Sequence, residues 1–215
     1  MDINIIASGS RGNAYLIGDG RTRLLLDAGI SFKRIQISCG FQTSSIDACL
    51  VTHRHGDHAM AIPKLLQRGT TVYSNVDVAE LHKGVRALMP LQEHTIGTFR
   101  ILPFEAEHDV PCYGYQVTST ATGEKLVYIT DSAYVRYTFT GLTHIMIEAN
   151  YDEDIMLGNV RDEKIPFSLA ERVAGTHMSI DTLIDLLRAN DMTKVRQIYL
   201  LHLSDNNSDA EVFKK

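Results

Sequence analysis

The sequence predicts an α/β fold, because short β-rich runs recur along the whole chain and segments with helical periodicity lie between several of them. A further observation narrows this class. The glycine fingerprint of dinucleotide-binding folds does not follow the first predicted strand, since residues 9–13 read Gly-Ser-Arg-Gly-Asn. The sequence therefore favours an α/β arrangement other than the doubly wound nucleotide-binding fold.

The predicted strands are runs rich in Val, Ile, Leu, Tyr and Thr that are bounded by turn residues. They cover residues 3–7, 14–18, 23–27, 48–52, 71–74, 98–105, 113–118, 125–130, 144–148 and 197–201. Because residues 9–13 form a short glycine-containing link, we expect the first strand to turn directly into the second.

Helical periodicity is clearest near the end of the chain, where apolar residues at 180, 183, 184 and 187 follow the spacing of one helix face. Ser179 is placed to cap the start of this helix and Asn190 to end it. Weaker patterns predict further helices over residues 62–66, 78–86 and 167–174.

Length and composition predict a single folded domain over residues 1–215. Hydrophobic residues make up 44% and charged residues 22%, which excludes a disordered or fibrous chain. The start of the chain lacks a secretory pattern and no apolar run approaches membrane-spanning length, so we expect a cytoplasmic protein that does not enter the membrane. The net charge of −5 argues against broad, non-specific binding to duplex nucleic acid.

The cysteines at 39, 49 and 112 are odd in number and widely spaced, with no Cys-x-x-Cys pair. We therefore expect reduced, structural thiols and no disulfide framework.

The most informative segment is His53-Arg54-His55-Gly56-Asp57-His58, which directly follows the predicted strand over residues 48–52. Imidazole nitrogens and carboxylate oxygens are ligands for Zn²⁺ and similar metals, and a loop at a strand end can turn alternate side chains toward two neighbouring ions. The alternative interpretation is a polar surface loop that happens to be rich in histidine. The composition favours a metal site.

This segment matches the His-x-His-x-Asp-His motif of the metallo-β-lactamase superfamily, and four further segments resemble motifs of that family in the same order. They are residues 25–29 (Leu-Leu-Asp-Ala-Gly), 107–109 (Glu-His-Asp), 128–132 (Tyr-Ile-Thr-Asp-Ser) and 199–204 (Tyr-Leu-Leu-His-Leu-Ser). The resemblance implies a four-layer αββα sandwich, in which two sheets lie between helices.

The resemblance also implies two divalent metal ions, with zinc as the first choice and manganese or iron as alternatives. Correspondence with the family motifs implies a catalytic role for Asp57 as well. It also implies that Asp131 lies between the two ions and that the ions share a nucleophilic hydroxide. The implied ligands are His53, His55 and His108 for the first ion, and Asp57, His58 and His202 for the second, with Asp131 as the bridge.

Residues 148–151, 175–179, 202–207 and 7–13 resemble segments of the nuclease branch of the family, which includes ribonuclease Z and small bacterial exonuclease-like proteins associated with cell-wall regulatory operons. This resemblance implies a phosphodiesterase or nuclease that cleaves DNA or RNA, with exonuclease action preferred. His177, just before a predicted helix, could hold a phosphate oxygen or protonate the leaving group, and Glu148 could orient it. Alternatively, His177 is a residue at the start of a helix and Glu148 a carboxylate at the end of a strand, and neither has a chemical role.

Other features limit this interpretation. The stretch between Asp131 and His177 is too short for the added domain of larger RNA-processing relatives, so we expect single strands, strand ends or short nucleotides as substrates. Arg54 should point away from the metals, whereas Arg11 is a better candidate for contacting phosphate. The histidines at 82, 94 and 144 are expected to be structural or exposed.

Two other functions remain open from the sequence. One is a hydrolase of a small thioester or lactone on the same metals, and the other is a non-catalytic metal-binding or regulatory protein that keeps the fold. A secreted β-lactamase is disfavoured because that group typically uses a cysteine where this chain has Asp131. No obligate protein partner is inferred, and the sequence does not decide between DNA and RNA.

Overall fold

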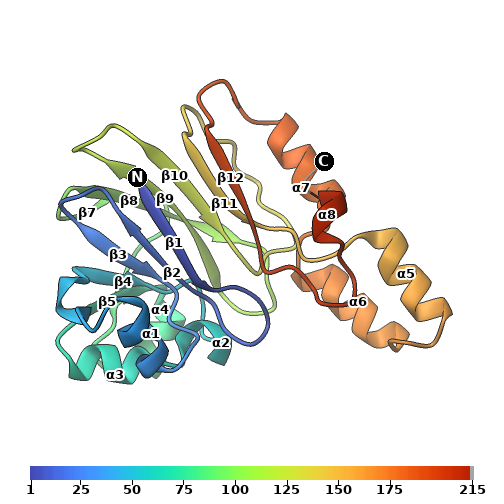
Figure 1. Cartoon of the computed structure of the whole chain (residues 1–215), viewed down its shortest axis with the longest axis horizontal. Coiled ribbons are helices and arrows are strands. Elements are labelled where there is room, and N and C mark those ends of the chain that lie inside the picture. The colour runs from blue at the N-terminus through green and yellow to red at the C-terminus, as the bar shows by residue number, and fades with distance from the viewer. Residues whose placement is uncertain (214–215) are drawn as a thin grey trace.

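Within residues 1–213, which the computed structural model describes, two β-sheets pack face to face and helices cover the outer face of each (Figure 1). The first sheet has the strand order β1-β2-β3-β4-β5-β6. Its strands are β1 (Asp2–Ala7), β2 (Ala14–Gly18), β3 (Arg23–Leu26), β4 (Ala48–Leu50), β5 (Thr71–Ser74) and β6 (Arg86–Ala87).

The second sheet has the strand order β12-β11-β10-β9-β8-β7. Its strands are β7 (His94–Ile96), β8 (Phe99–Ala106), β9 (Cys112–Ser119), β10 (Lys125–Ile129), β11 (His144–Glu148) and β12 (Gln197–Leu201). In both sheets antiparallel hairpins come first along the chain, and parallel pairings follow at β3-β4-β5-β6 and at β10-β11-β12. Because parallel strands end at the same edge of a sheet, their carboxyl ends can present side chains to one place.

The helices divide into two groups. On the first sheet lie α1 (Phe32–Ser38), the 3₁₀ turn η1 (Thr43–Ser45), α2 (Gly56–Ala59), α3 (Ile62–Gln67) and α4 (Val76–Leu81). On the side of the second sheet lie α5 (Glu153–Arg161), α6 (Phe167–Thr176), α7 (Ile180–Arg188) and α8 (Ala210–Phe213), drawn in orange to red in Figure 1. No helix in the described part of the chain is long and apolar enough to cross a membrane.

Three apolar clusters hold the layers together. The central cluster fills the space between the sheets with large buried side chains such as Tyr15, Phe99 and Tyr128. A second cluster packs α1, α3 and α4 on the first sheet, and a third packs α7 on the second. Burial of these apolar faces is the main force that stabilises such layers. The predicted four-layer αββα sandwich is confirmed.

The predicted strands all form, and the helix after Ser179 begins as expected, since the Ser179 side chain accepts a hydrogen bond from the Thr182 N–H. The bounds of the predicted helix over residues 78–86 are wrong. Asn75 caps the helix by accepting from the Val78 N–H, so α4 starts at residue 76, and residues 86–87 pair with β5 as a strand. Helices α1, α2, α5 and α8 were not predicted.

Other expectations concern side chains away from the strand ends. The three cysteines are free and buried, as predicted. His144 is buried at the start of β11 and contacts Thr143, whereas His82 ends α4 and His94 starts β7. None of these three histidines belongs to the ligand clusters described below.

A close backbone contact fixes the histidine-rich loop against the turn after β3. The Ala28 N–H donates to the His58 carbonyl at 2.8 Å, and the Asn13 N–H donates to the Asp57 carbonyl at 2.8 Å. A Cβ atom on Gly29 would lie 1.5 Å from the Asp57 carbonyl oxygen. Only glycine fits this position.

Gly29→Ala is therefore expected to lower the free energy of unfolding by about 3 kcal/mol, because the added methyl group must push the loop backbone away. Chemical denaturation measures this change. The matched control is Gly175→Ala in α6, where an added Cβ meets no atom within 4 Å, so stability should hold or rise by up to about 1 kcal/mol. Equal stability of the two variants would contradict the close contact.

Candidate metal centre

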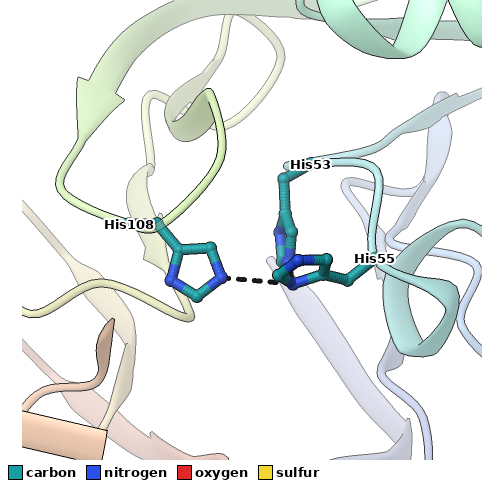
Figure 2. Close-up of side chains that lie close together, drawn as sticks. All are labelled: His53, His55 and His108. Atoms are coloured by element: carbon teal, nitrogen blue, oxygen red, sulfur yellow. Dashed lines mark hydrogen bonds between the residues drawn. The ribbon is translucent and has the colours of Figure 1, made fainter. Parts of the chain in front are cut away.

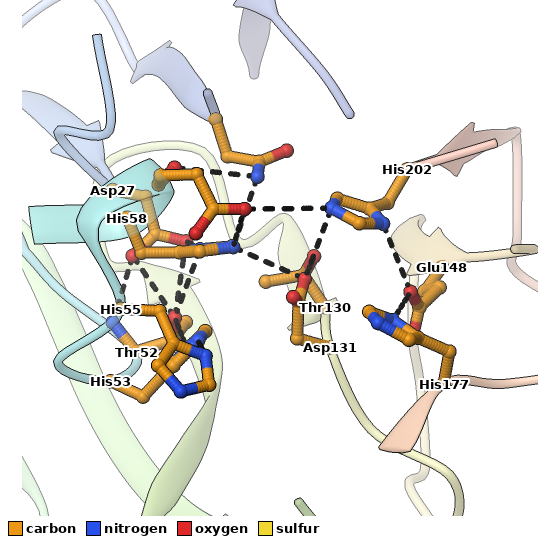
Figure 3. Close-up of polar contacts among 12 residues, drawn as sticks. Asp27, Thr52, His53, His55, His58, Thr130, Asp131, Glu148, His177 and His202 are labelled. Atoms are coloured by element: carbon orange, nitrogen blue, oxygen red, sulfur yellow. Dashed lines mark hydrogen bonds and ion pairs between the residues drawn. The ribbon is translucent and has the colours of Figure 1, made fainter. Parts of the chain in front are cut away.

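The polar side chains singled out by the sequence converge beyond the carboxyl ends of the strands in both sheets (Figure 3). Asp27 follows β3 and residues 53–58 follow β4, whereas Asp131 follows β10, Glu148 ends β11 and His202 follows β12. Parallel pairing within each sheet aligns these ends, so residues far apart in the sequence meet at one place.

Three of these positions have a backbone conformation that residues other than glycine rarely adopt. Asp27, Asp131 and His202 have φ angles of 54°, 48° and 52°. Each lies at the point where a strand gives way to a loop, and the left-handed turn redirects its side chain toward the shared site. Such strain costs about 1–3 kcal/mol per residue and concentrates at functional sites.

The first cluster consists of His53, His55 and His108, whose rings face one another (Figure 2). His55 Nδ1 lies 3.1 Å from His53 Nε2 and 3.3 Å from His108 Nε2. Three imidazole nitrogens around a tetrahedral zinc ion, with bonds of about 2.0–2.1 Å, would be separated by about 3.3 Å. The arrangement fits a metal ion held by three imidazoles.

The second cluster consists of Asp57, His58, Asp131 and His202, which offer ligand atoms within 4.8 Å of one another. Asp131 Oδ1 lies 3.2 Å from His58 Nε2 and 3.6 Å from His202 Nε2. Asp57 Oδ2 lies 3.7 Å from His58 Nε2 and 4.0 Å from His202 Nε2. Asp131 thus groups with the second cluster and not with the first.

One buried nitrogen atom indicates that the second cluster fits a cation. His202 Nε2 is buried and has no hydrogen-bond partner in the described residues, yet it faces the carboxylates of Asp57 and Asp131. A buried polar atom without a partner is costly unless a ligand satisfies it. One contact competes, because the Asn13 amide nitrogen lies 3.0 Å from His58 Nε2 and must yield this atom to a metal.

The protonation states differ between the clusters. Burial lowers the pKa of His53 and of His108, which favours the neutral imidazole that binds metals. Burial acts in the same direction on His202, but Asp131 and Glu148 outweigh it and raise its pKa to about 9. The pKa of His58 is raised well above its usual value by Asp131 and Asp27, again against burial. Metal binding at these two imidazoles therefore releases protons.

A layer of side chains behind the clusters orients the imidazoles. Asp27 Oδ2 accepts from His58 Nδ1 at 2.8 Å, and Thr52 Oγ1 lies 3.0 Å from His53 Nδ1 (Figure 3). The Asn150 amide lies 3.0 Å from His202 Nδ1. Such contacts fix the ring orientation of metal-binding histidines. The sequence signalled Asp27 only as part of a turn motif and gave no indication of the contacts of Thr52 and Asn150.

The buried Glu148 and the partly buried His177 form a pair next to the second cluster. Glu148 Oε1 lies 2.6 Å from His177 Nδ1 and 3.2 Å from His202 Nδ1. Glu148 Oε2 accepts from the backbone N–H of Ser132 and of Met178. Burial would lower the pKa of His177, but the Glu148 carboxylate raises it overall. The His177 ring also stacks on His202, with centroids 5.2 Å apart.

Of the two arginines considered from the sequence, only Arg54 has an expected direction that can be compared with the structure. Arg54 points away from the clusters and pairs with Asp77 at 3.3 Å. Arg11 is exposed and lies 3.8 Å from Asp205. Neither guanidinium contacts a candidate ligand.

The fold and the two clusters are those of a metal-dependent hydrolase. The family profile described as "Beta-lactamase superfamily domain" matches residues 22–203, so the chain belongs to the β-lactamase superfamily. The resemblance found in its motifs is confirmed.

Two relatives match nearly the whole chain. It is 26% identical over 230 aligned positions to exodeoxyribonuclease WalJ of Streptococcus pneumoniae, covering 97% of this chain and 84% of the relative. It is 26% identical over 235 aligned positions to exodeoxyribonuclease YycJ of Bacillus anthracis, covering 99% and 86%. The crystal structure of the metallo-β-lactamase fold protein YhfI of Bacillus subtilis has a TM-score of 0.75 and 20% identity, covering 99% and 89%, which shows the shared fold.

Asp131→Ala is expected to remove activity and to release most of the metal from the second cluster, because the substitution deletes the carboxylate that faces both His58 and His202. Elemental analysis after dialysis measures this loss. The control variants Cys39→Ser, Cys49→Ser and Cys112→Ser should retain their metal. Metal loss in a cysteine variant but not in Asp131→Ala would overturn the assignment.

Proposed function

We propose that this protein is a two-metal phosphodiesterase that hydrolyses nucleic acid, with exonuclease action on single strands, strand ends or short nucleotides. The observation that carries the proposal is the Glu148–His177 pair beside the second ligand cluster (Figure 3). The exodeoxyribonuclease names of two relatives that match almost the whole chain support the same substrate class.

In this proposal the two clusters hold two divalent ions, with zinc as the first choice and manganese or iron as alternatives. When bound, the ions supply Lewis acidity and lower the pKa of a coordinated water. The proposed ligands would be His53, His55 and His108 for one ion, and Asp57, His58 and His202 for the other. Asp131, which groups with the second set, is proposed as the ligand that both ions would share.

His177 supplies the proton that the leaving oxygen needs. Its Nδ1–H donates to Glu148, which leaves Nε2 free to contact the substrate, and 19% of the side chain is exposed. The raised pKa favours the imidazolium form, which can hold a phosphate oxygen and then transfer a proton to the departing oxygen. Glu148 is a positioning residue, because it acts through His177.

Asp57 has a part beyond that of a ligand in this proposal. Its side chain is 28% exposed, whereas those of His58, Asp131 and His202 are nearly inaccessible. Its carboxylate therefore lies on the solvent side of the cluster, where it can accept a hydrogen bond from an attacking water and orient it.

The alternative is a thioester or lactone hydrolase on the same metals. It is not favoured, because the relatives that match nearly the whole chain are named exodeoxyribonucleases. For a thioester, the thiolate leaving group also departs without protonation and gives no use for the Glu148–His177 pair. Location in the cytoplasm stays a prediction, and the free, buried cysteines are compatible with a reducing compartment.

His177→Ala is expected to lower turnover of a single-stranded oligonucleotide by roughly 10²- to 10⁴-fold while both metals remain bound. The loss should be smaller for bis-p-nitrophenyl phosphate, because p-nitrophenolate leaves as a stable anion and needs little protonation. Turnover of both substrates and elemental analysis are measured on the same preparation. Equal losses on the two substrates would contradict the acid role, and loss of metal would make His177 a ligand.

The acid role also predicts a pH dependence. Because Glu148 raises the pKa of His177 against the effect of burial, the acid form persists to higher pH than in an ordinary imidazole, and the rate should fall as the pH rises through that raised pKa. Glu148→Gln removes the carboxylate charge, so the pH at which the rate falls in the pH–rate profile should move to lower values. A fall that stays at the same pH would show that another group controls it.

A further inference from the structure

A polar cavity of about 440 Å³ lies beside the second ligand cluster, where the glycine turn between β1 and β2 faces α1 and the segment after β12. Its polar lining includes Ser8, Ser10, Arg11, Arg34 and Asp205.

The cavity adjoins the metal centre through direct contacts. Ser8 Oγ accepts from the backbone N–H of His202 at 2.8 Å, and Leu203, the next residue, lines the cavity. At the other end of the glycine turn, the Asn13 N–H donates to the Asp57 carbonyl at 2.8 Å. The lining residue Leu203 is therefore the neighbour of His202, and the lining residue Gly12 is the neighbour of Asn13, which hydrogen-bonds to Asp57.

The two arginines that line the cavity have few partners among the described residues. The Arg34 guanidinium makes no hydrogen bond or ion pair with any residue in the range 1–213. Arg11 faces Asp205 at 3.8 Å, and both side chains are more than four-fifths exposed, at 91% and 84%, so this pair contributes little. The backbone N–H groups of Ser10 and Arg11 donate to no protein acceptor in the described residues.

The composition of the lining identifies an anion as the ligand. Guanidinium groups bind phosphate through paired hydrogen bonds, and free backbone N–H groups of a tight turn add further donors. Among the described residues that line the cavity, none is aromatic, so it offers no platform on which a base could stack. In a chain with a net charge of −5, a cavity with two arginines and one aspartate beside the reaction site carries a net positive charge and favours an anionic substrate locally.

We propose that this cavity is a phosphate-binding subsite that holds a backbone phosphate of the substrate strand next to the one being cleaved, with Arg34 and Arg11 as its main contacts. The proposal rests on the nuclease function proposed above. It gives the enzyme a way to prefer a nucleic-acid strand over a small phosphodiester, because only a strand carries a second phosphate. Asp205 competes with that phosphate for Arg11.

The test compares Arg34→Glu with Lys33→Glu. Lys33 is the preceding residue of α1, exposed like Arg34, but it does not line the cavity. We expect Arg34→Glu to lower the ratio of kcat/KM for a labelled single-stranded oligonucleotide to that for bis-p-nitrophenyl phosphate by about tenfold or more, mainly through KM. Lys33→Glu should leave this ratio unchanged. Asp205→Asn should raise it, because the competing carboxylate is gone.

Salt dependence gives a second readout that a change in folding would not imitate. Each phosphate contact on a single strand contributes roughly 0.7 to the slope of log affinity against log salt. Arg34→Ala should therefore reduce the slope of log kcat/KM for the oligonucleotide by about 0.7, and Lys33→Ala should not.

The outcomes separate the two proposals. Wild-type protein that cleaves bis-p-nitrophenyl phosphate but no oligonucleotide would overturn the nuclease function and, with it, the subsite. Wild-type protein that cleaves the oligonucleotide, with equal ratios and slopes in the Arg34 and Lys33 variants, would overturn the subsite alone.

Discussion

The buried carboxylate of Asp27 connects the two sheets beneath the candidate metal centre, and the geometry of the site depends on it. Asp27 follows β3 in the first sheet, and its Oδ2 accepts from the Tyr128 hydroxyl of β10 in the second sheet at 2.6 Å. The same carboxylate accepts from the Thr52 N–H and from His58 Nδ1, both at 2.8 Å. A buried carboxylate that lost these donors would cost several kcal/mol, so the partners hold one another in place.

Buried charge and backbone strain occur together at this edge of the sandwich. Asp27, Asp131 and Glu148 are almost inaccessible to solvent, and two of them have left-handed backbone conformations. Neighbouring imidazoles neutralise part of this charge. Burial would raise the pKa of Asp131, but His58 and His202 hold it well below its usual range. Concentrated donors of this kind, held rigidly by strand ends, favour the binding of divalent cations over a purely structural role.

The sequence predicted the sandwich and the chemistry of the clusters because the residues concerned lie in short motifs at strand ends, where order along the chain is enough. The sequence did not predict contacts between distant segments. Arg34, for example, lies in no recognisable motif, and its place beside the glycine turn depends on how α1 packs on the first sheet. Helix α1 is too short to show a period, and in α5 Gly158 and the exposed Leu157 interrupt the apolar stripe. The bounds of α4 follow from a cap at Asn75 that the periodicity did not reveal.

The proposed acid and the proposed ligands come from different parts of the fold. His53, Asp131 and His202 lie shortly after strand ends and His58 lies in the short helix α2, whereas His177 lies in the link between α6 and α7. That link is attached to the segment after β11, because the Asn150 N–H donates to the Met178 carbonyl at 2.9 Å and the Ile180 N–H donates to the Tyr151 carbonyl at 2.8 Å.

The same segment also supports a ligand, since the Asn150 amide contacts His202. These contacts fix the position of the proposed acid relative to the candidate metal centre, although α5 and α6 form a small apolar cluster of their own, around Tyr151, Met156 and Ala170, outside the main core. Helix α6 nevertheless reaches a proposed ligand, because the backbone carbonyl of Thr176, its last residue, lies 3.0 Å from His108 Nδ1. The position of α6 therefore affects both the proposed acid and the orientation of one imidazole of the first cluster.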